Sequence, residues 1–306
     1  MKPAIRILHY ENRLATFNSE WISPLVEYTF HFEVYCPTQS YPAGTLFYVN
    51  IVGTSAAELD QLRNRGFKII YDNLWEQHAG AVDGALVLHN PAWFWYNEAL
   101  WYHHLNYAKH VPDRTYQYQA LMPMNLKKPH RDRLITQLGS TLDRMIWSYV
   151  AQGRQLPWDR DMNDWDTQRY VNPEWYNQSY CSIVAETAVE PNPYQSVFIT
   201  EKTFKPIAFK HPFLVYGHQH SLRTLHDLGF ATWDNLWDES YDSIQDPVQR
   251  CSAIVNIVKN IQVIPYDSET RYRLNHNADR FFDRVLVEQR IRTEIIDPII
   301  HYAETH

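Results

Sequence analysis

An acidic and a basic residue stand side by side at Glu201 and Lys202, where an apolar extended run meets the start of an expected helix. In parallel sheets, ligands bind beyond the carboxyl ends of the strands, where helix N-termini present free N–H groups and the positive end of the helix dipole. Phosphate groups are commonly bound at such helix N-termini. Thr200 can cap the helix, Lys202 could offer a point charge to a diphosphate, and Glu201 could accept hydrogen bonds from ribose hydroxyls.

The same residues also fit a helix start that binds nothing. Glutamate is favoured in a first helical turn because it complements the dipole, and the lysine would then be solvated or paired with a neighbour. Pro206 removes a backbone donor further along and predicts a bend after a short first turn. The corner therefore leaves a ligand-facing turn and a purely structural ion pair both open.

The elements that must position this corner occur in the order typical of parallel α/β sheets. Apolar runs typical of strands lie at 45–53, 68–73, 84–90, 116–125, 144–150, 180–189 and 212–217. Helical patterns separate several of these runs, and Gly66 is the expected stop of one such helix. Strand, helix, strand is the order of elements in a parallel sheet, so the sequence predicts an α/β fold.

The chain length of 306 residues favours two domains, each with its own core. We place the boundary near residue 115, because HVPDR breaks the pattern just before it. This gives an N-terminal domain at 1–115 and a C-terminal domain at 116–306. Hydrophobic residues at 45% and charged residues at 21% are near globular averages, so the chain is expected to fold throughout.

Charge and cysteine content exclude several classes of protein. A net charge of −7 disfavours a long duplex nucleic-acid footprint, although the basic stretch LKKPHRDR at 126–133 suits a nucleotide. Three distant cysteines, Cys36, Cys181 and Cys251, form no disulfide framework or metal motif. No apolar run reaches the about 18 residues of a membrane span. We expect a soluble protein of the cytoplasm with no membrane partner.

Two stretches around the corner resemble a known family. YCSIVAETAV at 180–189, followed by VFITEKTFKPIAFKHPFLVYG at 197–217, resembles the donor-binding segment of family 10 glycosyltransferases, the α1,3-fucosyltransferase family. In that family a strand ending in an acidic-polar pair precedes a TEK corner, a helix and a proline-led strand ending in glycine. MNLKKPHRDRLITQL at 124–138 resembles the family's stretch in which an Asn and a basic loop precede a helix-opening Arg.

The resemblance implies a GT-B fold, in which two Rossmann-like domains face each other across a cleft and the last helix packs back on the N-terminal domain. It implies that Arg131 and Lys202 hold the diphosphate of a nucleotide-sugar donor and that Glu201 holds the ribose. The other donor-binding residues in this interpretation are Asn125, Glu186, Phe198 and Thr200. The family's Glu-Asn pair is Glu-Thr here, so neither fucose nor guanosine is inferred.

The resemblance also implies a mechanism that inverts the anomeric carbon and needs neither metal nor cofactor beyond the donor. The two cations would stabilise charge on the departing diphosphate, and a residue of the N-terminal domain would take the acceptor proton. His89 and Glu98 are the candidate bases. Aromatic residues make up 15% of the chain, and Trp93, Trp95 and Tyr96 could form a stacking wall for the acceptor or simply belong to the core.

Two patterns bear on metal binding, and neither predicts a site. His103, His104 and His110 lack the i, i+4 spacing and the carboxylate partner of a helical zinc motif. A Trp- and Asp-rich loop resembles a calcium loop or a DxD motif, but it has no turn glycine and no closing glutamate, which favours a solvated acidic loop. Its residues are Asp159, Asp161, Asn163, Asp164 and Asp166.

Three hypotheses follow. The first is a hexosyl- or pentosyltransferase that moves a sugar from a nucleotide-diphosphate donor to a hydroxyl of a glycan, a protein or a modified DNA base. Similar-looking sequences are often encoded by bacteriophages, so DNA modification in the host cytoplasm belongs to this hypothesis. The second is a catalytically inactive nucleotide-binding or interaction module. The third is a structural ion pair at Glu201 and Lys202 that binds no ligand.

Overall fold

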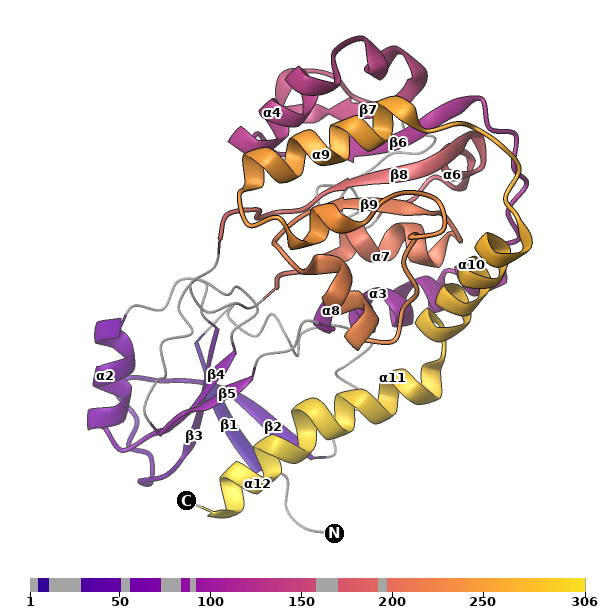
Figure 1. Ribbon diagram of the computed structural model, residues 1–306. Helices are drawn as coiled ribbons and strands as arrows, with labels where there is room; N and C mark the ends of the chain where they lie inside the picture. The colour runs from indigo at the N-terminus through magenta and orange to yellow at the C-terminus, as the bar shows by residue number, and fades with distance from the viewer. Residues whose placement is uncertain are drawn as a thin grey trace. The chain divides into compact units, whose positions relative to one another are not determined.

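The computed structural model describes residues 5–10, 29–50, 56–72, 84–88, 92–157, 170–191 and 197–305. The chain divides into two compact units, one formed by Met1–Trp101 with Asp283–His306 and the other by Tyr102–Phe282 (Figure 1). The predicted boundary at residue 115 therefore falls inside the second unit, in the extended segment before its first strand. The donor and acceptor roles of the two domains stay predictions.

The described part of the first unit contains a parallel sheet in the strand order β2-β1-β3-β4-β5. Its strands are β1 (Ile5–His9), β2 (Phe30–Val34), β3 (Leu46–Asn50), β4 (Lys68–Asp72) and β5 (Leu86–Leu88). Helix α2 (Ala56–Asn64) connects β3 to β4. The helix ends before Gly66, whose φ of 81° is accessible to glycine at little cost, as the sequence predicted.

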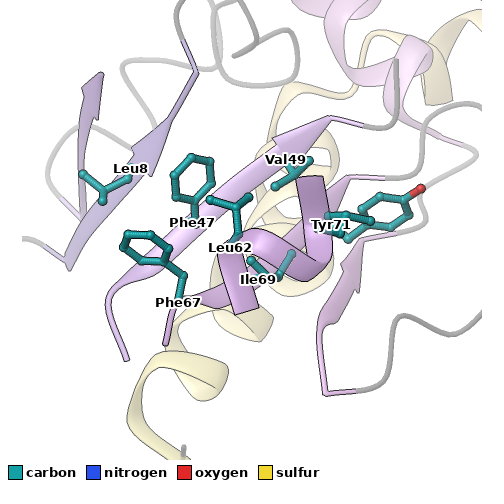
Figure 2. Packing of buried hydrophobic residues seen from close by; sticks show 8 residues of the cluster. Leu8, Phe47, Val49, Leu62, Phe67, Ile69 and Tyr71 are labelled. Atoms are coloured by element: carbon teal, nitrogen blue, oxygen red, sulfur yellow. The ribbon is translucent and has the colours of Figure 1, made fainter. Parts of the chain in front are cut away.

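The core of this unit packs between α2 and the sheet (Figure 2). Alternate residues of β3 and β4 point toward the helix, and two leucines three positions apart on α2 meet them. The buried cluster consists of Leu8, Phe47, Val49, Leu59, Leu62, Phe67, Ile69 and Tyr71. The intervening strand residues Tyr48 and Ile70 are also fully buried, as expected for a parallel sheet that is covered on both faces.

The C-terminal segment belongs to the first unit. It consists of α11 (Arg284–Ile291), a π-helical turn η6 (Arg292–Ile296) and α12 (Asp297–Thr305). The Tyr302 hydroxyl donates to the Gly84 carbonyl at 2.7 Å, which ties α12 to the segment just before β5. The last helix is thus held by residues of the N-terminal part of the chain.

The described part of the second unit has a parallel sheet in the order β7-β6-β8-β9. Its strands are β6 (Tyr118–Met124), β7 (Met145–Tyr149), β8 (Ser179–Ala185) and β9 (Phe213–Tyr216). Helix α4 (Pro129–Leu138) leads from β6 toward β7, and α7 (Glu201–Ala208) leads from β8 to β9. Both units are therefore Rossmann-like, and the predicted α/β fold class is confirmed.

The two crossovers of this sheet run in opposite directions from its centre. Because parallel crossovers are right-handed, α4 and α7 must cover opposite faces of the sheet. Figure 1 shows α4 beside α9 (Pro247–Asn260) on one side of the sheet, with α7 on the other. The chain segments leaving β6 and β8 consequently diverge, and this topological switch point is where doubly wound sheets bind ligands.

The remaining described elements of the second unit connect or cover this sheet. They are α6 (Pro173–Gln178), α8 (Ser221–Asp227), α10 (Ser268–Phe281) and the short turns η2 (Tyr107–Lys109), η3 (Gly139–Arg144), η4 (Val150–Gln152) and η5 (Ser240–Ser243). Helix α3 (Trp93–His104) begins in the first unit. Of the helices in the described ranges, none combines the length and apolarity that crossing a bilayer requires.

Candidate functional site

Three chain segments meet at the carboxyl ends of β6 and β8. Segment 125–132 follows β6, residues 186–187 follow β8, and residues 200–202 begin α7. Arg131 Nη2 donates to the Glu186 carbonyl at 3.3 Å, and Lys202 Nζ donates to Thr187 Oγ1 at 3.4 Å. The two cationic side chains named by the sequence therefore lie against successive residues at the switch point.

Arg131 ties the loop after β6 to the end of β8. It lies in the first turn of α4, which Pro129 opens, and only 3% of its surface is exposed. Its Nη1 donates to the Leu126 carbonyl at 2.9 Å and its Nη2 to the Ala185 carbonyl at 3.1 Å. Burial lowers the pKa of this guanidinium, and the charge of Glu186 offsets part of that effect. Arg131 thus carries a buried positive charge to the switch point.

Glu186 is fully buried, and its carboxylate holds the start of α7. Oε1 accepts from the Thr200 amide at 3.0 Å and from the Thr203 hydroxyl at 2.6 Å, while Oε2 accepts from the Thr200 hydroxyl at 2.5 Å. A buried carboxylate is costly unless such bonds satisfy it. In this structure the side chain faces hydrogen-bond donors of the protein, so its predicted role in binding the donor stays a prediction that the geometry does not favour.

Glu201 and Lys202 form an ion pair at the start of α7. Lys202 Nζ lies 2.7 Å from Glu201 Oε1 and 3.0 Å from Thr200 Oγ1. Their side chains keep 16% and 28% exposure, respectively, so both reach solvent. Burial alone would raise the pKa of the Glu201 carboxyl, but the ammonium groups of Lys202 and Lys205 outweigh it and hold that pKa below its ordinary value.

The other predicted donor-binding residues differ in exposure. Asn125 directly follows β6 and is exposed, whereas Phe198 is buried, with its amide donating to His218 Nδ1 at 3.2 Å. Thr200 is 1% exposed and caps α7 by accepting from the Lys202 amide at 3.4 Å, as the sequence predicted. Asn125, Glu201 and Lys202 are therefore the predicted donor-binding residues that a ligand can reach directly.

The aromatic residues predicted as an acceptor wall pack inside the first unit instead. Trp93, Trp95 and Tyr96 are at most 4% exposed. The Arg290 guanidinium lies over the Trp95 ring at 5.3 Å and also donates to the Tyr96 hydroxyl. The Tyr96 hydroxyl in turn donates to Glu294. This placement corresponds to the core alternative, and it does not favour the acceptor wall.

Only one of the two candidate bases, Glu98, lies within the described residues. His89 lies outside the described residues. Glu98, on α3, is only 2% exposed. The acidic loop at 159–166 also lies outside the described residues, and within the ranges that the structure describes no three His, Cys, Asp or Glu side chains are grouped to hold a metal ion.

Two functional-site neighbours were missed by the sequence reasoning. His130 Nε2 donates to the Glu186 carbonyl at 3.0 Å, beside Arg131, and its place in the basic stretch before a helix was the available signal. Gly217 ends the apolar run of β9, and a Cβ there would lie 3.3 Å from Glu186 Cγ and 2.9 Å from Ser221 Oγ. The glycine thus leaves room mainly for the Ser221 hydroxyl, and the Glu186 side chain also packs closely against it.

His130 is expected to make the protein less stable in acid. Burial lowers the pKa of His130 from its ordinary 6.5 to about 4. The unfolded chain therefore binds a proton first as the pH falls, and stability is lost between about pH 6.5 and pH 4. From pH 7 to pH 5 this residue should cost about 2 kcal/mol in the free energy of unfolding, measured with urea.

The matched control is His130→Gln, which keeps a donor for the Glu186 carbonyl but does not titrate. Its free energy of unfolding should fall about 2 kcal/mol less than that of the wild type over this pH range. His211, another buried histidine with a lowered pKa, is common to both proteins and cancels. Equal slopes for the two proteins would contradict the assignment.

The geometry defines a class: two Rossmann-like units, with two cationic side chains against successive residues at the switch point of the second. Neither a protein-family model nor a curated protein sequence matches the chain. Among solved structures it is similar to an α1,3-fucosyltransferase, with a TM-score of 0.52, 8% identity, and coverage of 92% of this chain and 82% of that chain. A structure of α1,3-fucosyltransferase with GDP-fucose gives 0.51, 8%, 99% and 91%, respectively.

At 8% identity this likeness shows a shared fold. The neighbours are α1,3-fucosyltransferases, the enzymes that the two sequence stretches resemble. The α/β architecture of two Rossmann-like units is therefore shared with the enzymes named by that resemblance, over nearly the whole chain.

Proposed function

We propose that the chain is a glycosyltransferase that binds a nucleotide-diphosphate sugar at the carboxyl edge of the second unit's sheet. The observation that carries this proposal is the placement of Arg131 and Lys202 against successive residues at the switch point. Ligands of doubly wound sheets bind at such points, and two cations there suit a diphosphate. The fold shared with α1,3-fucosyltransferases, one of them solved with GDP-fucose, supports it.

The ion pair at the corner suggests how the donor is received. A diphosphate beside Lys202 offers more negative charge than the Glu201 carboxylate, which now lies 2.7 Å from the ammonium. The ligand would take over the ammonium and release Glu201, whose oxygens could then accept from ribose hydroxyls. The ion pair thus keeps both side chains in place for their proposed roles.

The finer features of the reaction extend the proposal. Lys202 would contact the departing diphosphate, and the buried charge of Arg131 would add to the positive potential at that place. No metal or cofactor would be needed, and the anomeric carbon would be inverted. The two units would face each other in the GT-B manner, and a base of the first unit would take the acceptor proton. The burial of Glu98 favours His89 for that role.

The acceptor in this proposal is a hydroxyl of a glycan, a protein or a modified DNA base. A modified base would have to leave the helical stack to be reached. The proposal includes a bacteriophage-encoded enzyme that acts in the host cytoplasm. The rival is a catalytically inactive nucleotide-binding module, for which the burial of Glu98 is the favouring observation.

A thermal-shift panel of UDP, GDP, ADP and CDP tests the premise shared by the transferase and the inactive module. One of the four should stabilise the chain, by about 2.7 kcal/mol at a concentration 100 times its dissociation constant. The corresponding sugar nucleotides are then incubated with the protein, and release of the free diphosphate is followed. Slow hydrolysis identifies the transferase and its absence the inactive module, whereas no stabilisation by any diphosphate contradicts both.

A further inference from the structure

Glu186 lies between the two cationic side chains of the candidate site, Arg131 of α4 and Lys202 of α7. Its carbonyl oxygen accepts from His130 and Arg131 of α4, at 3.0 and 3.3 Å. Its amide donates to the Tyr216 carbonyl at the end of β9, at 2.9 Å. The backbone of this residue is therefore held in place by α4 and β9. Its side chain extends from this fixed position to the first turn of α7.

The side chain of Glu186 reaches Lys202 through one hydroxyl group. Lys202 Nζ lies 3.0 Å from Thr200 Oγ1, and Thr200 Oγ1 lies 2.5 Å from Glu186 Oε2. An ammonium only donates and a carboxylate only accepts, so the single hydroxyl proton of Thr200 must point to Glu186. The lone pairs of the same oxygen then face Lys202. The carboxylate thereby sets the direction of the whole chain of hydrogen bonds.

We propose that Glu186 is a positioning residue that holds the Lys202 ammonium in place through the Thr200 hydroxyl. The inference rests on the proposed function only for what Lys202 binds. Glu186 is 0% exposed, and its two oxygens are occupied by Thr200 and Thr203, so it acts without touching the ligand. This role differs from the direct donor contact that the sequence resemblance implied.

Glu186→Gln isolates the carboxylate, because the backbone carbonyl that holds Arg131 is unchanged. The new amide nitrogen can donate to Thr200 Oγ1 and so compete with Lys202 for its lone pairs. The affinity for the stabilising nucleoside diphosphate should fall about tenfold, which corresponds to about 1.4 kcal/mol. The affinity for the matching nucleoside, which lacks the diphosphate, should change less than about twofold.

Thr203→Val is the matched control. It removes a buried hydroxyl that donates to the same carboxylate at 2.6 Å, on the same helix, but this hydroxyl is outside the chain to Lys202. It should lower the melting temperature as Glu186→Gln does and leave the diphosphate affinity near that of the wild type. In the Lys202→Ala background, Glu186→Gln should have no further effect on diphosphate affinity, because the group that it positions is gone.

Equal losses for nucleoside and nucleoside diphosphate would overturn the proposal in favour of a general structural role. Full additivity of Glu186→Gln and Lys202→Ala would overturn it in favour of independent action. An effect of Thr203→Val on diphosphate affinity as large as that of Glu186→Gln would also overturn it, because the pathway through Thr200 would then not be specific.

A second measurement needs no ligand and separates this inference from the proposed function. In protein labelled with ¹⁵N-lysine, the Lys202 ammonium should give a slowly exchanging NMR signal, assigned by its loss in Lys202→Arg. The signal should persist in Thr203→Val and disappear or shift in Glu186→Gln. If no diphosphate binds but this pattern is found, the proposed function fails and the positioning role stands; an unchanged signal in Glu186→Gln overturns the positioning role.

Discussion

Lys202→Ala should slow hydrolysis of the sugar nucleotide, measured as kcat/KM, by about 100- to 1000-fold, the range seen when one preorganised donor to a developing negative charge is removed. The ammonium is the more exposed of the two cations at the switch point, at 28%. It can therefore meet the departing diphosphate directly, whereas Lys205, the other lysine near Glu201, lies one turn further along α7. Lys202→Arg should recover part of the rate, because it restores the charge with a different shape.

The control for this prediction is Lys259→Ala. Lys259 is an exposed lysine in the last turn of α9, and the neighbouring carbonyls of Val258 and Ile261 accept hydrogen bonds from Gln119 near the start of β6. It therefore lies at the opposite edge of the sheet. Its removal changes the net charge equally but should leave kcat/KM within about twofold of the wild type. Similar losses in both variants would mean that general charge, and not the switch point, attracts the donor.

Phe209→Ala should lower the free energy of unfolding of the second unit by about 3–5 kcal/mol, the usual cost of truncating a buried phenylalanine. Phe209 is fully buried at the end of α7. Its ring stacks on Tyr176 at 5.0 Å, meets Tyr107 edge-on at 5.0 Å and lies 5.2 Å from His110. The change would leave a cavity among aromatic rings that cannot collapse easily. Urea denaturation followed by tryptophan fluorescence and by circular dichroism measures the loss.

Tyr272→Ala is the comparison for Phe209→Ala. This aromatic side chain belongs to the same unit but is 66% exposed on α10, so its loss should change the free energy of unfolding by no more than about 0.5 kcal/mol. A loss below about 1 kcal/mol for Phe209→Ala would show that the aromatic cluster around α7 is not a tightly packed core.

Much of the fold could be predicted from local patterns. The apolar run at 116–125 corresponds to β6 (Tyr118–Met124), and that at 180–189 contains β8 (Ser179–Ala185) apart from its first residue. Both strands are buried on both faces, which produces continuous apolar runs in the sequence. The start of α7 was predicted at Glu201 because a threonine cap precedes it. These features depend on neighbours in sequence, so sequence reasoning could reach them.

The location of the aromatic segment could not be predicted from local patterns. Its tryptophans and tyrosine suit a stacking surface and a core equally well, since their chemistry is the same in both. Arg290 and Glu294, almost two hundred residues away in sequence, contact Trp95 and Tyr96 and bury them in the core. No spacing within the segment carries that information.

Some features of the candidate site were likewise predictable from local sequence, and others depend on the tertiary structure. Residue types alone determined that a cap, an acid and a base stand at a strand-to-helix corner, and that an arginine opens another helix, because capping and charge act over a few residues. Only the tertiary structure decided that Glu186 is buried under Thr200 and Thr203, beside a glycine at the end of β9. Burial and hydrogen-bond direction depend on which strands and helices pack together, and that is settled by the order of strands in the sheet.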